Sequence, residues 1–263
     1  PEVYERTVSR IESVLHIDSE YAHELAERRR ILAADPTRHA VLPHMRTAAW
    51  DTMCALMTEL ATAYPDTMSL TRDGDTWRWR NELLDITQDF VVGDESSLPC
   101  DPLAYIAGQV QDDIVLLDQR DGDLFADAGV VTFSAGWSFG FDVGMTFLEI
   151  HGPVPGLRES GVITRAREFL MRLQPNQIYR RTNWSMTIGR TLDVSVETLA
   201  DRAHARAALD SIDDETFGRV LHLRVEVQHL IRLPESGAIC FLIRTYMLPL
   251  ADDWRLLRGP FSE

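Results

Sequence analysis

A chain of 263 residues with 45% hydrophobic and 25% charged residues is typical of a globular protein that buries its own core. Its formal net charge of −15 would repel nucleic acid and anionic membranes, so we exclude both as partners. The apolar runs are far shorter than the roughly 20 residues that a membrane helix needs, and no signal-peptide pattern is present. We therefore expect a cytoplasmic protein.

The first 65 residues are predicted to be helical and to pack on the same domain as the rest of the chain. Glu20–Ala33 is rich in Ala, Leu, Glu and Arg, and Thr47–Ala63 has apolar residues near helical spacing. Pro65 disfavours helical geometry in Tyr64, so the second helix should end there.

Short strands and loops are expected between residues 66 and 102, where tryptophans alternate with arginines. Residues 103–112 are compatible with a helix. Ile114–Leu117 then reads as a strand, closed by the turn at 119–123 and paired with Val130–Phe133 in an antiparallel hairpin.

The second half of the chain predicts a helix at Arg165–Leu173 and strands at Val220–His229 and Ala238–Met247. In the first of these strands, leucine and valine alternate strictly with a polar row, namely His222, Arg224, Glu226 and Gln228. This polar row is either solvated or lines a pocket. Helices and hairpins without a βαβ rhythm indicate an α+β fold with an antiparallel sheet.

One histidine, His151, stands at the end of an apolar, strand-like run and just before Pro153 and Pro155. The two prolines stiffen the backbone beyond the imidazole. The ring could cap a turn, or it could serve as a ligand or catalytic group, and these residues alone leave both open.

The other motifs exclude several kinds of site. The histidines are dispersed, and the three cysteines (Cys54, Cys100 and Cys240) have no CxxC spacing, so no zinc or iron–sulfur site is expected. A haem is not excluded in this way, because its iron needs only one protein ligand. All 26 basic residues are arginine, which excludes a lysine Schiff base or P-loop lysine and leaves arginine to recognise carboxylates.

Eight short motifs in chain order resemble the haem-dependent oxidative N-demethylase family, in particular its haem-carrying α-subunit. The most specific are Gly136-Trp137, Ile150-His-Gly-Pro-Val-Pro, Arg181-Thr-Asn-Trp-Ser, Arg224-Val-Glu-Val-Gln and Ile243-Arg-Thr-Tyr. Together the motifs extend from about residue 20 to 250.

This resemblance implies a PAS-like antiparallel sheet that, with the N-terminal helices, encloses a pocket for haem b. It implies a haem domain at 66–250 and a C-terminal tail at 251–263. The implied reaction oxidises a small amine with O₂, using electrons from NADPH through a separate flavin and iron–sulfur reductase. Oligomerisation is compatible with this interpretation.

The resemblance also assigns roles to individual residues. His151 is the expected iron ligand; the other expected cofactor-binding residues are Arg181, Trp184, Arg244 and Trp137. The expected catalytic residues are Glu226, Arg224 and Asn183. Four of these residues have a structural alternative: Arg181 as a surface charge, Arg244 paired with Glu226 across the sheet, and Asn183 with Trp184 as core and turn residues.

Two positions depart from the family pattern, which prefers basic residues where this chain has Asp142 and Val227. We therefore expect a related haem oxygenase acting on another small amine or amino-acid-like molecule rather than on dimethylamine. The alternatives are a haem-binding sensor or carrier without turnover, and a cofactor-free binding or scaffold subunit.

Overall fold

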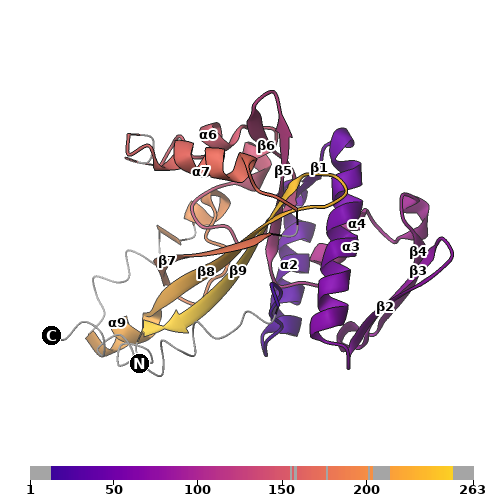
Figure 1. The fold of residues 1–263 in the computed structure, drawn as a ribbon. Coiled ribbons are helices and arrows are strands. Elements are labelled where there is room, and N and C mark those ends of the chain that lie inside the picture. The colour runs from indigo at the N-terminus through magenta and orange to yellow at the C-terminus, as the bar shows by residue number, and fades with distance from the viewer. Residues whose placement is uncertain are drawn as a thin grey trace, which may run out of the picture.

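The computed structural model of the protein describes residues 13–154, 156, 159–175, 177–200, 202–203 and 214–250. Within these ranges helices pack on two antiparallel sheets, which confirms the predicted α+β class (Figure 1). The expected tail at 251–263 and Pro155 lie outside the described residues. No helix in these ranges has the length and apolar character that crossing a membrane requires.

Two helices, α2 (Tyr21–Ala34) and α3 (Arg46–Ala63), confirm the prediction for the N-terminal region. Tyr64 is the C-cap of α3, as Pro65 requires. Three short elements connect the two helices: η1 (Pro36–Arg38), β1 (His39–Val41) and η2 (Pro43–Met45).

A three-stranded sheet confirms the short strands expected after residue 66, and Figure 1 shows it on the far side of α3 from the larger sheet. Trp79 and Phe90 on this sheet belong to the same buried cluster as Met53 and Met57 of α3. The elements of this region are β2 (Met68–Asp73), β3 (Thr76–Asn81), η3 (Glu82–Leu84), β4 (Ile86–Val91), η4 (Glu95–Ser97) and α4 (Pro102–Ala107).

The larger sheet has six strands in the order β1-β6-β5-β9-β8-β7, and all neighbours are antiparallel. Its remaining strands are β5 (Asp113–Arg120), β6 (Asp123–Val130), β7 (Ile178–Ile188), β8 (Leu221–Arg232) and β9 (Ile239–Pro249). The expected antiparallel hairpin is confirmed, and Val130 pairs with Ile114, but the partner strand runs from Asp123 to Val130 and not from Val130 to Phe133. Asp121 and Gly122 both have positive φ, which makes a tight turn, so the partner strand begins at once.

This sheet has two covered faces, which we name after the helices on them. Leu116 and Leu242 lie on the α3 face, in the core with α3. Val115 and Ile239 lie on the α6 face, in a second cluster with residues of α5 and α7. Because side chains alternate along each strand, the register assigns every residue of β7, β8 and β9 to one face or the other.

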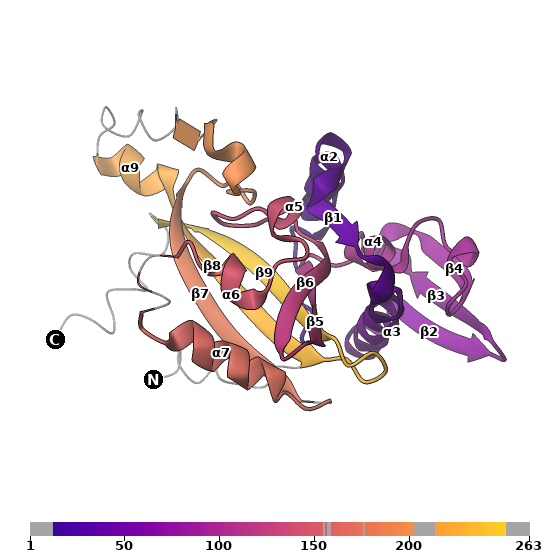
Figure 2. The ribbon, with the colours of Figure 1, turned by 90° about the horizontal axis from the view of Figure 1, so that it is seen from above.

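The α6 face is covered by α5 (Phe139–Asp142), α6 (Phe147–Ile150) and α7 (Val162–Met171), which come between β6 and β7 in the chain (Figure 2). The helix predicted at Arg165–Leu173 is confirmed. The strand predicted to end at His151 was wrong, because His151 is the C-cap of α6. Two further short helices are η5 (Val196–Thr198) and α9 (Asp214–Val220).

A buried ion pair ties α2 to the large sheet. Arg28 and Asp113 are each 1% exposed and lie 3.0 Å apart. The Arg28 guanidinium also donates to the carbonyl oxygens of Ala107 and Gln111, at 2.7 and 3.1 Å. Asp113 accepts the backbone N–H of Thr132 at 2.9 Å. This pair thus joins α2, the end of α4, the start of β5 and the segment after β6.

Arg28→Met should therefore destabilise the protein by about 3–5 kcal/mol, since it leaves Asp113 as an unpaired buried charge. Urea unfolding measures this change. Arg30→Met is the control on the same helix, because its ion pair with Glu27 is mostly exposed and should matter little. Equal effects of the two substitutions would contradict this role of Arg28.

Candidate functional site

Four of the predicted site residues, Arg181, Asn183, Arg224 and Glu226, share the α6 face with Gln228. In the β7–β8 register, Arg181 lies opposite Gln228 and Asn183 lies opposite Glu226. Arg181 and Asn183 are exposed. Glu226 and Gln228 are 8% and 6% exposed. On this face, buried polar side chains of β8 therefore lie beside exposed polar side chains of β7.

The polar row of β8 is buried, while its apolar row is only half-buried. Burial of this row is possible because its side chains hydrogen-bond to one another. Arg224 Nε donates to Glu226 Oε1 at 3.2 Å, and Gln228 Nε2 donates to Glu226 Oε2 at 3.0 Å. Both oxygens of the Glu226 carboxylate are thereby held in place.

Arg224 is fully buried and all its donor nitrogens are engaged. Besides Glu226 it donates to the carbonyl oxygen of Leu192 at 2.7 Å, to that of Phe133, and to Thr245 Oγ1 at 3.1 Å. Four of the five N–H donors of this guanidinium thus have protein partners. Its geometry suits positioning Glu226 rather than direct catalysis.

Gln228 has a buried carbonyl oxygen, Oε1, with no hydrogen-bond partner among the described residues. Leaving such an acceptor unpaired costs stability. Together with the Glu226 carboxylate, it makes this part of the α6 face a set of acceptors. Groups of this kind accept hydrogen bonds from N–H donors.

His151 is positioned by a capping box at the start of α6. Thr146 Oγ1 accepts the backbone N–H of Glu149, and the Glu149 carboxylate accepts the backbone N–H of Thr146. At the other end of the helix, His151 Nδ1 lies 2.7 Å from the carbonyl oxygen of Phe147. A carbonyl can only accept, so Nδ1 carries the proton.

The imidazole of His151 therefore has its lone pair on Nε2 when it is neutral. No partner of Nε2 is present in the described part of the chain. Burial lowers the pKa of His151 below its ordinary value, the hydrogen bond to Phe147 opposes this shift, and the nearby charge of Arg181 adds to it. A neutral ring with a fixed tautomer and a free Nε2 is the form in which histidine binds metals.

The remaining predicted residues are divided between the two faces. Trp137 packs against the cluster of the α6 face. Trp184 lies opposite Val225 and Arg244 lies opposite Val227, so both belong to the α3 face. The alternative in which Arg244 pairs with Glu226 was wrong, because the guanidinium binds Asp18 and Glu24 instead.

Asp142 and Val227, the two positions that depart from the family pattern, lie in different environments. Val227 is on the α3 face. Asp142 is 7% exposed, and burial, followed by the negative charge of Glu197, raises its pKa to about 6. A carboxylate stands here in place of a cation.

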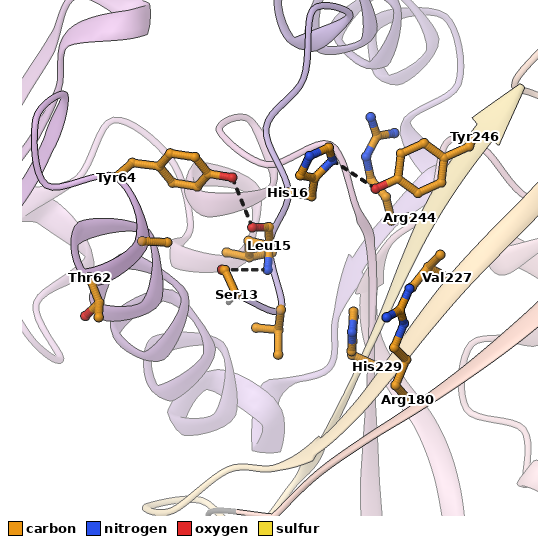
Figure 3. A pocket seen from close by; sticks show the side chains of 12 residues that line it. Ser13, Leu15, His16, Thr62, Tyr64, Arg180, Val227, His229, Arg244 and Tyr246 are labelled. Carbon is orange, nitrogen blue, oxygen red and sulfur yellow. Dashed lines mark hydrogen bonds between the residues drawn. The ribbon is translucent and has the colours of Figure 1, made fainter. Parts of the chain in front are cut away.

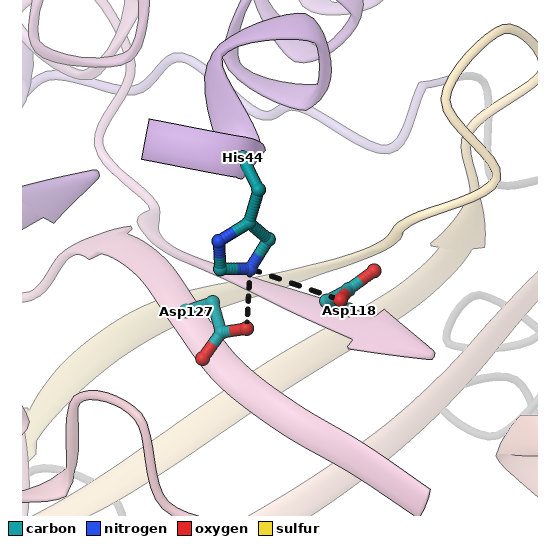
Figure 4. Close-up of side chains that lie close together, drawn as sticks. All are labelled: His44, Asp118 and Asp127. Carbon is teal, nitrogen blue, oxygen red and sulfur yellow. Dashed lines mark hydrogen bonds and ion pairs between the residues drawn. The ribbon is translucent and has the colours of Figure 1, made fainter. Parts of the chain in front are cut away.

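A possible metal cluster lies elsewhere, at the β5–β6 hairpin (Figure 4). His44 Nε2 is 2.8 Å from Asp127 and 3.8 Å from Asp118. Arg120 forms ion pairs with both carboxylates. Its guanidinium already supplies the positive charge, so the geometry is that of an ion-pair network.

Sequence reasoning did not single out two residues that the structure makes prominent, Gln228 and His229. Gln228 was noted only as a member of the polar row. His229 interrupts the apolar row of β8 after Val227, and that break in the alternation was an available signal.

The buried Asp142 predicts a specific pH dependence of stability. Its pKa is raised on folding, so ionisation opposes folding; the penalty is absent below about pH 4 and complete above about pH 6. Asp142→Asn should therefore be more stable than the parent at pH 7.5 and equally stable at pH 4. Thermal unfolding at both pH values tests this. Asp66→Asn, at an exposed site, is the control, and a gain that is equal at both pH values would contradict the assignment.

The sequence of this chain matches a known protein family. The sequence matches the model of the family described as "Haem-dependent oxidative N-demethylase, alpha subunit-like" over residues 6–253. This match covers nearly the whole chain, including all of the site residues discussed above. The chain therefore belongs to the haem-dependent oxidative N-demethylase, alpha subunit-like family.

Proposed function

We propose that the large sheet and the helices on its α6 face form a PAS-like unit. Five of its strands follow the spatial order β6-β5-β9-β8-β7, and α5, α6 and α7 lie between β6 and β7 in the chain. The helices α5, α6 and α7 therefore form one inserted segment, which packs on a single face of the sheet. The domain boundaries at residues 65 and 250 stay predictions, since β2–β4 share a core with α3.

We further propose that haem b binds on the α6 face, with His151 as its iron ligand. The side chains there fit this group. His151 offers a neutral ring with a free Nε2, and Arg181 is an exposed cation near it that suits a propionate. Trp137 and Phe147 contribute apolar surface. When bound, the haem supplies oxygen activation for oxidising the substrate.

The proposed substrate is a small amine or an amino-acid-like molecule. The observation that carries this proposal is the buried acceptor pair of Glu226 and Gln228 on the same sheet face as Arg181, whose charge acts on His151. Glu226 holds the amine nitrogen through a charge-assisted hydrogen bond, and Gln228 Oε1 accepts a second N–H. Arg224 fixes the Glu226 carboxylate, and Asn183 borders it on the exposed strand.

Electrons are proposed to come from NADPH through a separate flavin and iron–sulfur reductase. The name of the family, alpha subunit-like, supports a partner subunit. The cysteines of this chain do not suit a cluster, because Cys240 is buried, Cys54 half-buried and Cys100 exposed, whereas such clusters need up to four converging thiolates.

His151→Ala should abolish the Soret band of the haem-supplied protein and its shift with CO, because the iron loses its protein ligand. Absorption spectra of the reduced protein with and without CO measure this. His23→Ala, at an exposed position on α2, is the control and should keep the parental spectrum. An unchanged spectrum for His151→Ala would refute the ligand assignment. A parent protein that stays colourless would refute haem binding itself.

Glu226→Gln should lower kcat/KM for amine oxidation by roughly tenfold to a hundredfold, since a hydrogen bond to a charged group is lost. Its Soret band should match that of the parent. Turnover of a panel of small amines, with a reductase and NADPH, measures this. Glu235→Gln, an exposed change at the β8–β9 turn, is the control. If the parent binds haem but oxidises none of the amines, a sensor or carrier replaces the enzyme as the function.

A further inference from the structure

A cavity of about 610 Å³ lies on the α3 face of the sheet. Figure 3 shows it between the segment at residues 13–16, the end of α3, and strands β7, β8 and β9. Its sheet wall carries Arg180, His229 and Arg244, which point away from the face with Glu226. The cavity is therefore separate from the proposed haem site, and its volume is typical of small-molecule sites.

His229 is the most unusual group in this cavity. It is 4% exposed, and neither ring nitrogen has a hydrogen-bond partner among the described residues. Burial, and then the positive charge of Arg180, lowers its pKa to about 4. The ring is thus neutral at pH 7 and offers one N–H donor and one acceptor nitrogen. Burying both without partners costs stability, unless a ligand satisfies them.

Arg244 also keeps one donor unused. It is 2% exposed, and its terminal nitrogens bind Asp18 and Glu24, each at 2.7 Å. Its Nε is buried and has no partner among the described residues. The charge of Arg244 is therefore balanced, while its Nε–H remains available to a ligand.

Arg180 lines the cavity, and its positive charge forms no ion pair with another described residue. It is exposed on β7 and lies directly opposite His229. Glu59, whose negative charge also acts on His229, is already held by Ser13 Oγ at 2.6 Å and by the backbone N–H of Val14 at 3.0 Å. An anion that enters the cavity would thus meet a free guanidinium beside unused hydrogen-bonding groups.

We propose that this cavity binds a small organic carboxylate, through the guanidinium of Arg180 and the Nε–H of Arg244, with His229 as a further hydrogen-bonding partner. The planar fork of arginine matches a carboxylate in a bidentate manner. A neutral histidine adds no charge of its own and accepts or donates one bond to the rest of the ligand. The site is independent of haem and of the proposed amine.

The test uses the full chain and three probes, acetate, succinate and benzoate, each beside its neutral amide. Binding is followed by calorimetry and by the ¹⁵N signals of the His229 ring. We expect at least one carboxylate to bind, to shift the His229 signals, and to bind at least tenfold more tightly than its amide. Arg180→Gln should weaken that binding roughly tenfold to a hundredfold.

Arg181→Gln is the matched control, because it changes the next residue on β7, on the opposite face. It should leave the affinity and the His229 shift unchanged. The proposal is overturned if no carboxylate binds, if the amides bind as tightly, or if Arg181→Gln weakens binding while Arg180→Gln does not. Because Arg180 is exposed, Arg180→Gln should fold, and an unchanged melting temperature verifies this.

Discussion

Arg224 lies wholly inside the protein, and a buried guanidinium is tolerable only where its donors are met. Its partners come from the segment after β6, from the chain at Leu192, from β9 and from Glu226 on its own strand. The same contacts that neutralise this charge therefore hold four segments together and orient a carboxylate. The proposed substrate site depends on that arrangement, since Glu226 and Gln228 are aligned by it.

Alternation along β7 and β8 gives this sheet two chemically different faces. The α6 face carries the acceptors of Glu226 and Gln228 and is covered by α6, the helix whose C-cap is His151. On the α3 face, exposed Arg180 and the unpartnered nitrogens of His229 and Arg244 are grouped at a cavity. Neighbouring residues of one strand thus face opposite sides of the sheet, where we propose an amine site on one side and a carboxylate site on the other. Substitutions at adjacent residues of one strand can therefore test the two proposed sites separately.

The long helices and the alternation of β8 could be predicted from the sequence, because both follow from periodic patterns. Which face of β8 is buried could not, since an apolar row is ordinarily the buried one, and only tertiary partners of Arg224 reverse this. His151 was assigned to a strand because the apolar run outweighed the capping box of Thr146 and Glu149. The ion pairs of Arg244 depend on register and on α2, and neither can be read locally.

The central claim is that iron is bound on the α6 face. A crystal structure of the haem-supplied protein tests this most directly. The account predicts iron bonded to Nε2 of His151, with the Glu226 and Gln228 acceptors facing the same pocket. Iron bonded to His229 in the cavity of the α3 face, or haem bound with no histidine from either face, would contradict it.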